Sequence, residues 1–306
     1  MDRKTLQEHR LVNWLQSALL LLGMGGVFAA LGWLLGGVQL MLWTTGLGLF
    51  LLGLAPRVSP HLVLRMQGAV PLGPREAPRL HALVDNLARR AGLEHTPRIY
   101  YLPSPILNAF TLGSREDTAI AVSEGLLRRL NRRELSGVLA HEISHVRNND
   151  IQVMGLADLV ARLTGALSLT GQLLVLINLP LFLFGAAQIS WLAILLLIFA
   201  PLVTALMQLA LSRTREFEAD LGAAALTGDP SALASALRKL EDPRGLLGRI
   251  FLPRRPRTEP AMLRTHPATE ARIRRLLALT PAARTLRSAA GPLWPLDAPP
   301  TRRRWF

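Results

Sequence analysis

The sequence predicts an α+β fold that is predominantly helical, in which two hairpins of membrane-spanning helices interrupt a soluble domain with a small β-sheet. Two observations lead to this fold. No Asp, Glu, Lys or Arg occurs between Arg10 and Arg57, or again between Arg162 and Arg213. The remainder is charged and alternates between amphipathic helical patterns and short β-branched runs. Each uncharged interval is long enough for two spans of about 20 residues, so four spans are predicted.

The spans are expected at residues 14–35, 38–54, 163–184 and 191–211, with turns at Gly36-Gly37 and near 185–188. These limits divide the chain into six segments. They are an N-terminal segment (1–13), a first hairpin (14–54), a first soluble part (55–162), a second hairpin (163–211), a second soluble part (212–278) and a tail (279–306). Neither turn contains Lys or Arg, whereas the flanking segments are basic. The positive-inside rule therefore predicts that the N-terminus, the soluble parts and the tail are all cytosolic.

The composition sets limits on partners. The chain has 35 Lys and Arg against 21 Asp and Glu, a net charge of +14, yet half of its residues are apolar. No base-reading motif accompanies the basic clusters, so no nucleic acid is expected, and a surface facing anionic lipid headgroups explains the charge. A chain without Cys has no disulfides, and only His and carboxylate groups remain as probable ligands for a transition metal.

The soluble elements follow from local patterns. An amphipathic helix is expected at 76–91, ending at Gly92, and strands at 98–102, 109–112 and 118–122. Later segments are expected to form a helix at 229–240, a Pro/Arg-rich loop at 242–264 and a helix at 269–277. The basic, Pro-rich tail carries no predicted structure.

One further helix carries the main chemical signal. Asn131 and Glu134 form an expected capping-box pair at its start. An apolar stripe follows at Leu135, Val138, Leu139, Ile143 and Val146. In the same helix, His141 and His145 are four residues apart and so lie on one face, with Glu142 beside them. This H-E-x-x-H pattern is typical of a zinc site with an adjacent base.

Catalytic zinc usually takes three protein ligands. The candidate source of the third is the segment S-R-T-R-E-F-E-A-D at 212–220, which is also expected to be helical. Glu216 and Asp220 are four residues apart there. One carboxylate can bind the metal while the other accepts a hydrogen bond from a ligand imidazole.

These two motifs together resemble the HtpX-like membrane zinc metallopeptidases, a gluzincin family that also includes the CAAX prenyl endopeptidase. Further matching pieces occur in order over roughly residues 60–278: Asn108-Ala109-Phe110, Glu124-Gly125-Leu126-Leu127, Asn149-Asp150, Thr265-His266-Pro267 and Arg272-Ile273. The resemblance implies a gluzincin-type peptidase domain holding one Zn²⁺ per chain through His141, His145 and Glu216. It also implies that Asp220 accepts a hydrogen bond from His141.

The resemblance implies a mechanism as well. Zinc would lower the pKa of a water molecule, and Glu142 would take its proton as the water attacks a peptide carbonyl. His266 is nominated to stabilise the oxyanion, with Arg272 as a partner that orients it. His266 could equally be a helix-entry residue before Pro267.

Asn108, Ala109 and Phe110 lie in an expected edge strand that could align an extended substrate by backbone pairing. Phe110 could equally be an ordinary core residue. The predicted protein is an endopeptidase of the bacterial inner membrane that cleaves extended or misfolded membrane proteins on the cytosolic side. Two alternatives remain open: a narrow-specificity peptidase of the CAAX prenyl type, and a non-enzymatic membrane protein that binds anionic lipid. The sequence does not predict an oligomeric state.

Overall fold

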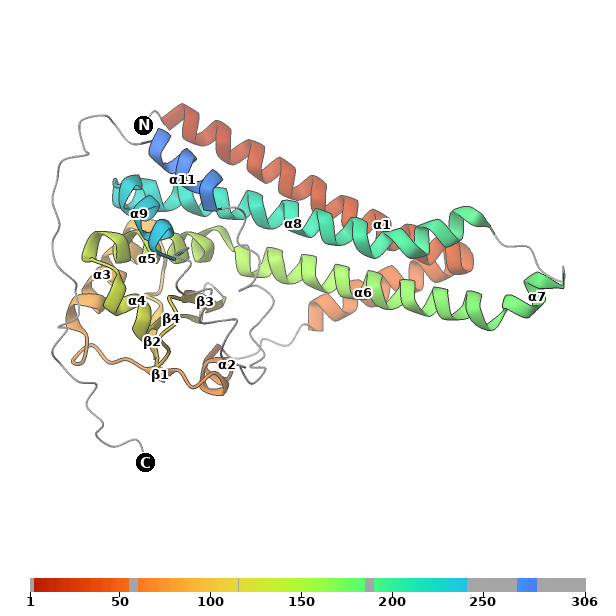
Figure 1. Cartoon of the computed structure of the whole chain (residues 1–306), viewed down its shortest axis with the longest axis horizontal. Helices are drawn as coiled ribbons and strands as arrows, with labels where there is room; N and C mark the ends of the chain where they lie inside the picture. The colour runs from red at the N-terminus through yellow and green to blue at the C-terminus, as the bar shows by residue number, and fades with distance from the viewer. Residues whose placement is uncertain (1–2, 55–59, 115, 185–189, 241–268, 280–306) are drawn as a thin grey trace. The chain divides into compact units, whose positions relative to one another are not determined.

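The computed structural model describes residues 3–54, 60–114, 116–184, 190–240 and 269–279 (Figure 1). The chain divides into two compact units. The helical unit comprises Met1–Arg57 and Gln152–Arg215, and the mixed unit comprises Val58–Ile151 and Glu216–Phe306. The predicted loop at 242–264, the tail, the second hairpin turn and His266 lie outside the described residues.

The helical unit is built from α1 (Arg3–Leu54), α6 (Asp150–Ile177), α7 (Leu179–Leu183) and α8 (Trp191–Thr227). Three of them, α1, α6 and α8, are long and apolar enough to cross a membrane. Helix α6 begins before the predicted span at 163–184 but ends at Ile177, with the short α7 following it, so that span is not one continuous helix. Helix α8 begins as predicted and extends past its predicted end at Leu211, because no Pro or Gly occurs there. As a result, α8 continues without interruption into the segment that carries Glu216 and Asp220.

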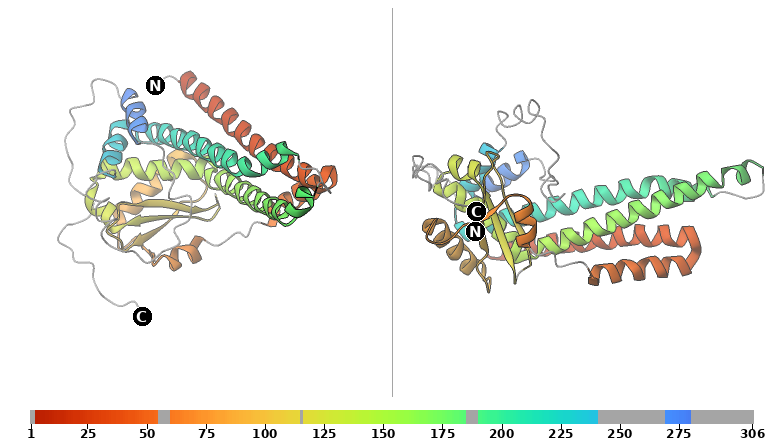
Figure 2. Two further views of the ribbon diagram at one scale, coloured as in Figure 1. Left: turned by 45° about the vertical axis from the view of Figure 1, so that its right-hand side comes forward. Right: turned by 90° about the horizontal axis from the view of Figure 1, so that it is seen from below.

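Helix α1 folds back on itself at the predicted turn (Figures 1 and 2). Gly36 and Gly37 have non-helical backbone angles, and the φ of Gly37 is 66°, a left-handed conformation that favours glycine. Beside the turn, a Cβ on Gly32 would lie only 2.5 Å from Thr44 Oγ1. The close approach of the two α1 segments therefore requires glycine at position 32.

Helices α6 and α8 meet where Pro201 interrupts the hydrogen bonds of α8. Proline has no N–H, so the carbonyl of Leu197 four residues earlier loses its helical donor. Two side chains of α6 donate to that carbonyl instead: the Ser168 hydroxyl, and the Gln172 amide at 3.0 Å. A Cβ on Gly171 would lie 2.4 Å from a Leu197 methyl carbon, so glycine permits the close approach. Neighbouring helices commonly satisfy backbone groups that proline frees in apolar surroundings.

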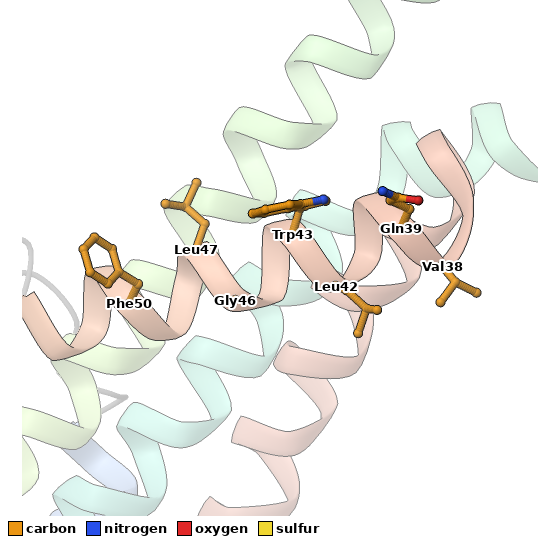
Figure 3. Close-up of a pocket in the computed structure, with 7 residues that line it drawn as sticks. All are labelled: Val38, Gln39, Leu42, Trp43, Gly46, Leu47 and Phe50. Carbon is orange, nitrogen blue, oxygen red and sulfur yellow. The ribbon is translucent and has the colours of Figure 1, made fainter.

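The outer surface of the helical unit is strongly apolar. Trp43, Trp191 and Leu192 are each at least 70 % exposed. A shallow hollow runs along the second segment of α1 and is lined by Val38, Gln39, Leu42, Trp43, Gly46, Leu47 and Phe50 (Figure 3). The hollow has no carboxylate, imidazole or cationic group among its lining residues. Such a surface suits hydrocarbon rather than water.

The mixed unit contains a four-stranded sheet in the order β1-β2-β4-β3. Its strands are β1 (Val70–Pro71), β2 (Arg98–Leu102), β3 (Ala109–Gly113) and β4 (Thr118–Ser123). β2 and β4 are parallel, whereas the other two pairings are antiparallel. The three predicted strands are confirmed to within one residue. The sequence analysis missed β1, because two residues are too few to produce an alternating pattern.

The helices that begin in the described part of the mixed unit are α2 (Pro60–Met66), α3 (Pro78–Ala91), α4 (Glu124–Arg129), α5 (Arg132–Asn148), α9 (Pro230–Leu240) and α11 (Thr269–Ala278). The main core cluster joins one face of the sheet to α3, α5, α9 and α11. A second cluster packs α2 against the opposite face through Leu64, Tyr100 and Phe110. The sheet is therefore covered on both faces, and α5 lies beside β3 (Figure 1).

Candidate metal centre

Helix α5 fixes the positions of the two histidines. Its start is the predicted capping box: Asn131 Oδ1 accepts from the Glu134 N–H at 3.0 Å, and Glu134 Oε2 accepts from the Asn131 N–H at 2.9 Å. The carboxylate of Glu134 also accepts from Ser235 and Lys239 of α9, each at 2.7 Å. The predicted apolar stripe is buried throughout. Packing and capping together therefore fix the orientation of α5 about its own axis.

Three ligand atoms converge beside α5. The Nε2 atoms of His141 and His145 are 3.1 Å apart. Glu216 places Oε2 at 3.4 Å from the His141 Nε2 and Oε1 at 3.7 Å from the His145 Nε2. Tetrahedral zinc with bonds of about 2.0–2.1 Å would hold its ligand atoms about 3.3 Å apart. The spacing and the N, N, O donor set therefore fit a small tetrahedral cation.

Close helix packing brings Glu216 to the histidines. In the mixed unit, the end of α8 approaches α5 at Gly222, where a Cβ would lie 2.5 Å from Ser144 Oγ. Any larger side chain at position 222 would push the helices apart. His145 and Glu216 lie 71 positions apart in the chain, so only this packing brings these candidate ligands together.

Each imidazole is oriented by a carboxylate on its other nitrogen. His141 Nδ1 lies 3.0 Å from Asp220 Oδ1, the partner that the family resemblance implies. His145 Nδ1 lies 2.8 Å from Asp150 Oδ2. Asp150 belongs to the Asn149-Asp150 pair of the family resemblance, but no role follows for it from the sequence. The turn explains the contact: Asn149 adopts a left-handed conformation with φ 61°, which ends α5 and directs Asp150 back toward the site.

Arg272 supplies the compensating positive charge. Its guanidinium makes two hydrogen bonds of 2.8 Å to Asp220 and an ion pair of 2.8 Å to Glu216. The residue is only 2 % exposed. Burial lowers the pKa of Arg272, but its hydrogen bonds to Asp220 and the negative charges of Asp220, Glu216 and Glu142 outweigh this and raise it. Arg272 therefore contacts two carboxylates of the site. Its expected role in orienting His266 stays a prediction, because His266 lies outside the described residues.

The electrostatic balance favours positive charge at the histidines. Burial and the neighbouring Arg272 lower the pKa of His141, yet hydrogen bonds to Asp220 and Glu216 outweigh them and raise it to about 9. The pKa of His145 is also raised, because its hydrogen bond to Asp150 and the Glu216 charge overcome burial and the repulsion from His141. The carboxylates that raise these pKa values would also attract a metal cation, which would have to displace the protons because only a neutral imidazole binds a metal.

Glu142 lies beside these three candidate ligands, and a hydrogen bond from the β-sheet holds its carboxylate in place. Its Oε2 accepts a hydrogen bond of 2.8 Å from the hydroxyl of Thr111 on β3. The residue is 9 % exposed. No local pattern in the sequence points to Thr111, because its hydrogen bond to Glu142 depends on the contact between β3 and α5.

The predicted substrate strand forms an edge of the described sheet. β3 pairs with β4 on one side, from Ala109 opposite Val122 to Gly113 opposite Thr118. The backbone of Asn108 bonds to Ser123 through both its carbonyl and its N–H. The side chain of Phe110 is buried in the second core cluster, on the face of the sheet that packs against α2. Its side chain is thus a core group, one of the two roles considered from the sequence.

Comparisons with known proteins identify the family. A model of peptidase family M48 matches residues 74–280. A relative from Pyrococcus furiosus, named a protease HtpX homolog, is 37 % identical over 86 % of this chain and 94 % of its own length. A homolog of the same name from Methylibium petroleiphilum is 34 % identical over 88 % of this chain and 98 % of its own.

A solved structure shares the fold. The crystal structure of Ste24p from S. mikatae has a TM-score of 0.51 and 20 % sequence identity, covering 88 % of this chain. The chain spans about two thirds (66 %) of the length of that structure. Because the family model matches more than half of the sequence, and because close relatives match over nearly their whole lengths, this multi-pass membrane metallopeptidase belongs to peptidase family M48.

Proposed function

We propose that the protein is a zinc-dependent endopeptidase that hydrolyses peptide bonds of extended or misfolded membrane proteins on the cytosolic side of the bacterial inner membrane. The observation that carries the proposal is the convergence of His141, His145 and Glu216, with Glu142 alongside. Two imidazoles and one carboxylate form a ligand set typical of catalytic zinc, which keeps a further position open.

Zinc, when bound by these three residues, would polarise the peptide carbonyl and lower the pKa of a water molecule. Glu142 then acts as the general base, taking a proton from water as it attacks the carbonyl carbon and passing it to the departing amine. Asp220 and Asp150 orient the two imidazoles through Nδ1 and so leave each Nε2 for the metal. We assign oxyanion stabilisation to His266, as the family resemblance implies.

The substrate class follows from the edge strand. An extended polypeptide can add to β3 by backbone hydrogen bonds, whereas a folded protein cannot present such a strand. This requirement favours locally unfolded substrates and a role in protein quality control. Ala109 would contribute backbone groups at the start of this strand, whereas the backbone of Asn108 already bonds to Ser123.

The proposed topology has four crossings: two in α1, separated by the turn at Gly36-Gly37, one in α6 and one in α8. Both turns would be extracytoplasmic, because the basic segments flank the opposite ends of the spans. Substituted-cysteine labelling tests this directly, since the chain has no native Cys. Gly36→Cys and Ser190→Cys should react with an impermeant maleimide in intact spheroplasts, whereas Glu94→Cys should react only after lysis. Labelling of Glu94→Cys before lysis would reverse the orientation.

The activity is tested with detergent-purified protein and fluorescein-labelled casein, an unfolded polypeptide. We expect cleavage that 1,10-phenanthroline abolishes and stoichiometric Zn²⁺ restores, with one zinc per chain by elemental analysis. Zinc-loaded, correctly folded protein that leaves casein and a panel of unfolded membrane segments intact would refute the endopeptidase. Chelator-insensitive binding to anionic liposomes without cleavage would support a lipid-binding protein instead.

A further inference from the structure

We propose that Thr111 is a positioning residue for the reaction: its backbone pairs with the substrate while its hydroxyl orients the catalytic carboxylate of Glu142. This inference rests on the proposed peptidase function and adds a residue that neither motif contains. It joins two parts of the site, the substrate strand and the base.

The hydrogen bond between them has a definite geometry. Thr111 Oγ1 donates to Glu142 Oε2 at 2.8 Å, across 31 positions of sequence. A glutamate side chain has several rotatable bonds, and the helix fixes only the position of its Cα and Cβ atoms, not that of its carboxylate. With Oε2 held by the hydroxyl, Oε1 is the oxygen left to accept the proton from water. A general base must be held within hydrogen-bond reach of the proton it removes.

Strand geometry directs the Thr111 side chain toward α5, the helix that carries Glu142. Successive side chains of a strand point to opposite faces. Phe110 and Leu112 belong to the cluster on the α2 face, whereas Ala109 packs against the main core, which includes α5. Thr111 shares the face of Ala109, and its hydroxyl therefore reaches the helix that carries Glu142.

The backbone N–H and C=O groups of Thr111 point away from β4, toward the free edge of the sheet. Ser123 donates to the Asn108 carbonyl at 2.9 Å, and Ser114 donates to the Asp117 carbonyl at 3.2 Å. Because antiparallel ladders alternate, residues 108, 110, 112 and 114 bond to β4, and residues 109, 111 and 113 direct their N–H and C=O groups away from it. An incoming strand would therefore pair with the backbone of Thr111.

This double role predicts a separation of kinetic effects. Removing the hydroxyl leaves the backbone groups of β3 in place, so substrate pairing, and with it KM, should change little. Glu142 would lose its orienting donor, so kcat should fall. General-base catalysis contributes about 10²- to 10⁴-fold to such reactions, and loss of orientation should remove about 10- to 100-fold of it.

The experiment compares Thr111→Val, Thr111→Ala and Thr111→Ser with the wild type, using purified full-length protein and an internally quenched unfolded peptide. Thr96→Val is the matched control, because the Thr96 hydroxyl also donates to a carboxylate, that of Asp85 at 2.9 Å on the surface. We expect kcat to fall about 10- to 100-fold in the Val and Ala variants with KM within about threefold. Thr111→Ser should recover most of the rate, and Thr96→Val should match the wild type.

Zinc content and melting temperature are measured for every variant. If the bulkier Val variant fails to fold, the Ala variant, which removes the hydroxyl without adding volume, decides the outcome. Wild-type kcat in a folded hydroxyl-free variant would overturn the proposal, as would a raised KM at unchanged kcat or a failure of Ser to rescue. Failure of the peptidase function itself would be distinct, since the wild type would then show no chelator-sensitive cleavage.

Discussion

The two units bury polar groups for different purposes. In the helical unit, a neutral network joins α6 to α8: Ser168 and Gln172 donate to the Leu197 carbonyl that Pro201 leaves without its helical partner. In the mixed unit, the network at the metal centre is charged, and Arg272 balances Asp220 and Glu216 beside two imidazoles. A neutral network repairs one backbone defect. A charged network holds groups whose protonation and metal binding can do chemistry, and its members depend on one another far more strongly.

The largest effect is expected from a change that leaves both networks intact. Glu142→Gln keeps the three metal ligands and the shape of the side chain but removes the base. Peptide hydrolysis should fall by about 10²-fold or more. Zinc content and melting temperature should stay at wild-type values. Near wild-type turnover in this variant would remove Glu142 from the mechanism.

Arg272→Met should reveal how far the charged network depends on its cation. Two buried carboxylates would lose their compensating charge, and breaking such a buried pair costs about 3–5 kcal/mol. Thermal unfolding followed by far-ultraviolet circular dichroism measures the loss. Arg275→Met on the same helix is the control, since Arg275 lies 3.7 Å from the ring centre of Phe217 in a cation–π contact worth about 0.5–1 kcal/mol at an exposed site. Equal destabilisation by both changes would contradict the charged network.

Asp220→Asn tests orientation rather than charge balance alone. The hydrogen bond to His141 weakens, and loss of such a partner typically lowers metal affinity about 10- to 100-fold. Competition with a fluorescent zinc chelator measures the affinity, and excess zinc should restore part of the activity. Asp85→Asn, a carboxylate that is 48 % exposed on α3, should bind zinc like the wild type. If the zinc affinity of Asp220→Asn were unchanged, Asp220 would have no role in orienting His141.

The smallest effect is expected in the helical unit. Gln172→Leu removes one of two donors to the Leu197 carbonyl, and interhelical hydrogen bonds in membranes are worth about 0.6 kcal/mol on average. Tryptophan fluorescence during thermal unfolding is a suitable probe, because Trp14, Trp33, Trp43 and Trp191 all belong to this unit. Gln39→Leu, on the exposed hollow of α1, should be neutral or stabilising in a bilayer. If Gln172→Leu lowered the stability more than Arg272→Met does, the neutral network would be the more important of the two, contrary to the comparison between the units.

The helix of the H-E-x-x-H motif shows what local sequence can specify. Its capping box, its buried stripe and the alignment of His141 with His145 depend on residues within one or two turns, and all three predictions were confirmed. The same holds for the turn of α1, where Gly37 adopts the conformation that glycine favours. Uncharged length was enough to predict apolar helices, although α8 continues past its predicted end because no residue there stops a helix.

The sequence by itself determined the longer helices and strands, although not the short β1, α2 and α7, and it determined the two histidines and, through the family resemblance, Glu216 and Asp220. Only the tertiary structure decided which distant groups meet them. Asp150 returns to His145 through a left-handed turn, Arg272 arrives on α11 to balance two carboxylates, and Thr111 reaches Glu142 from an edge strand. The physical reason is that periodicity and capping are short-range properties of the backbone. Hydrogen bonds across 31 or 52 positions exist only after packing has brought separate helices and strands together.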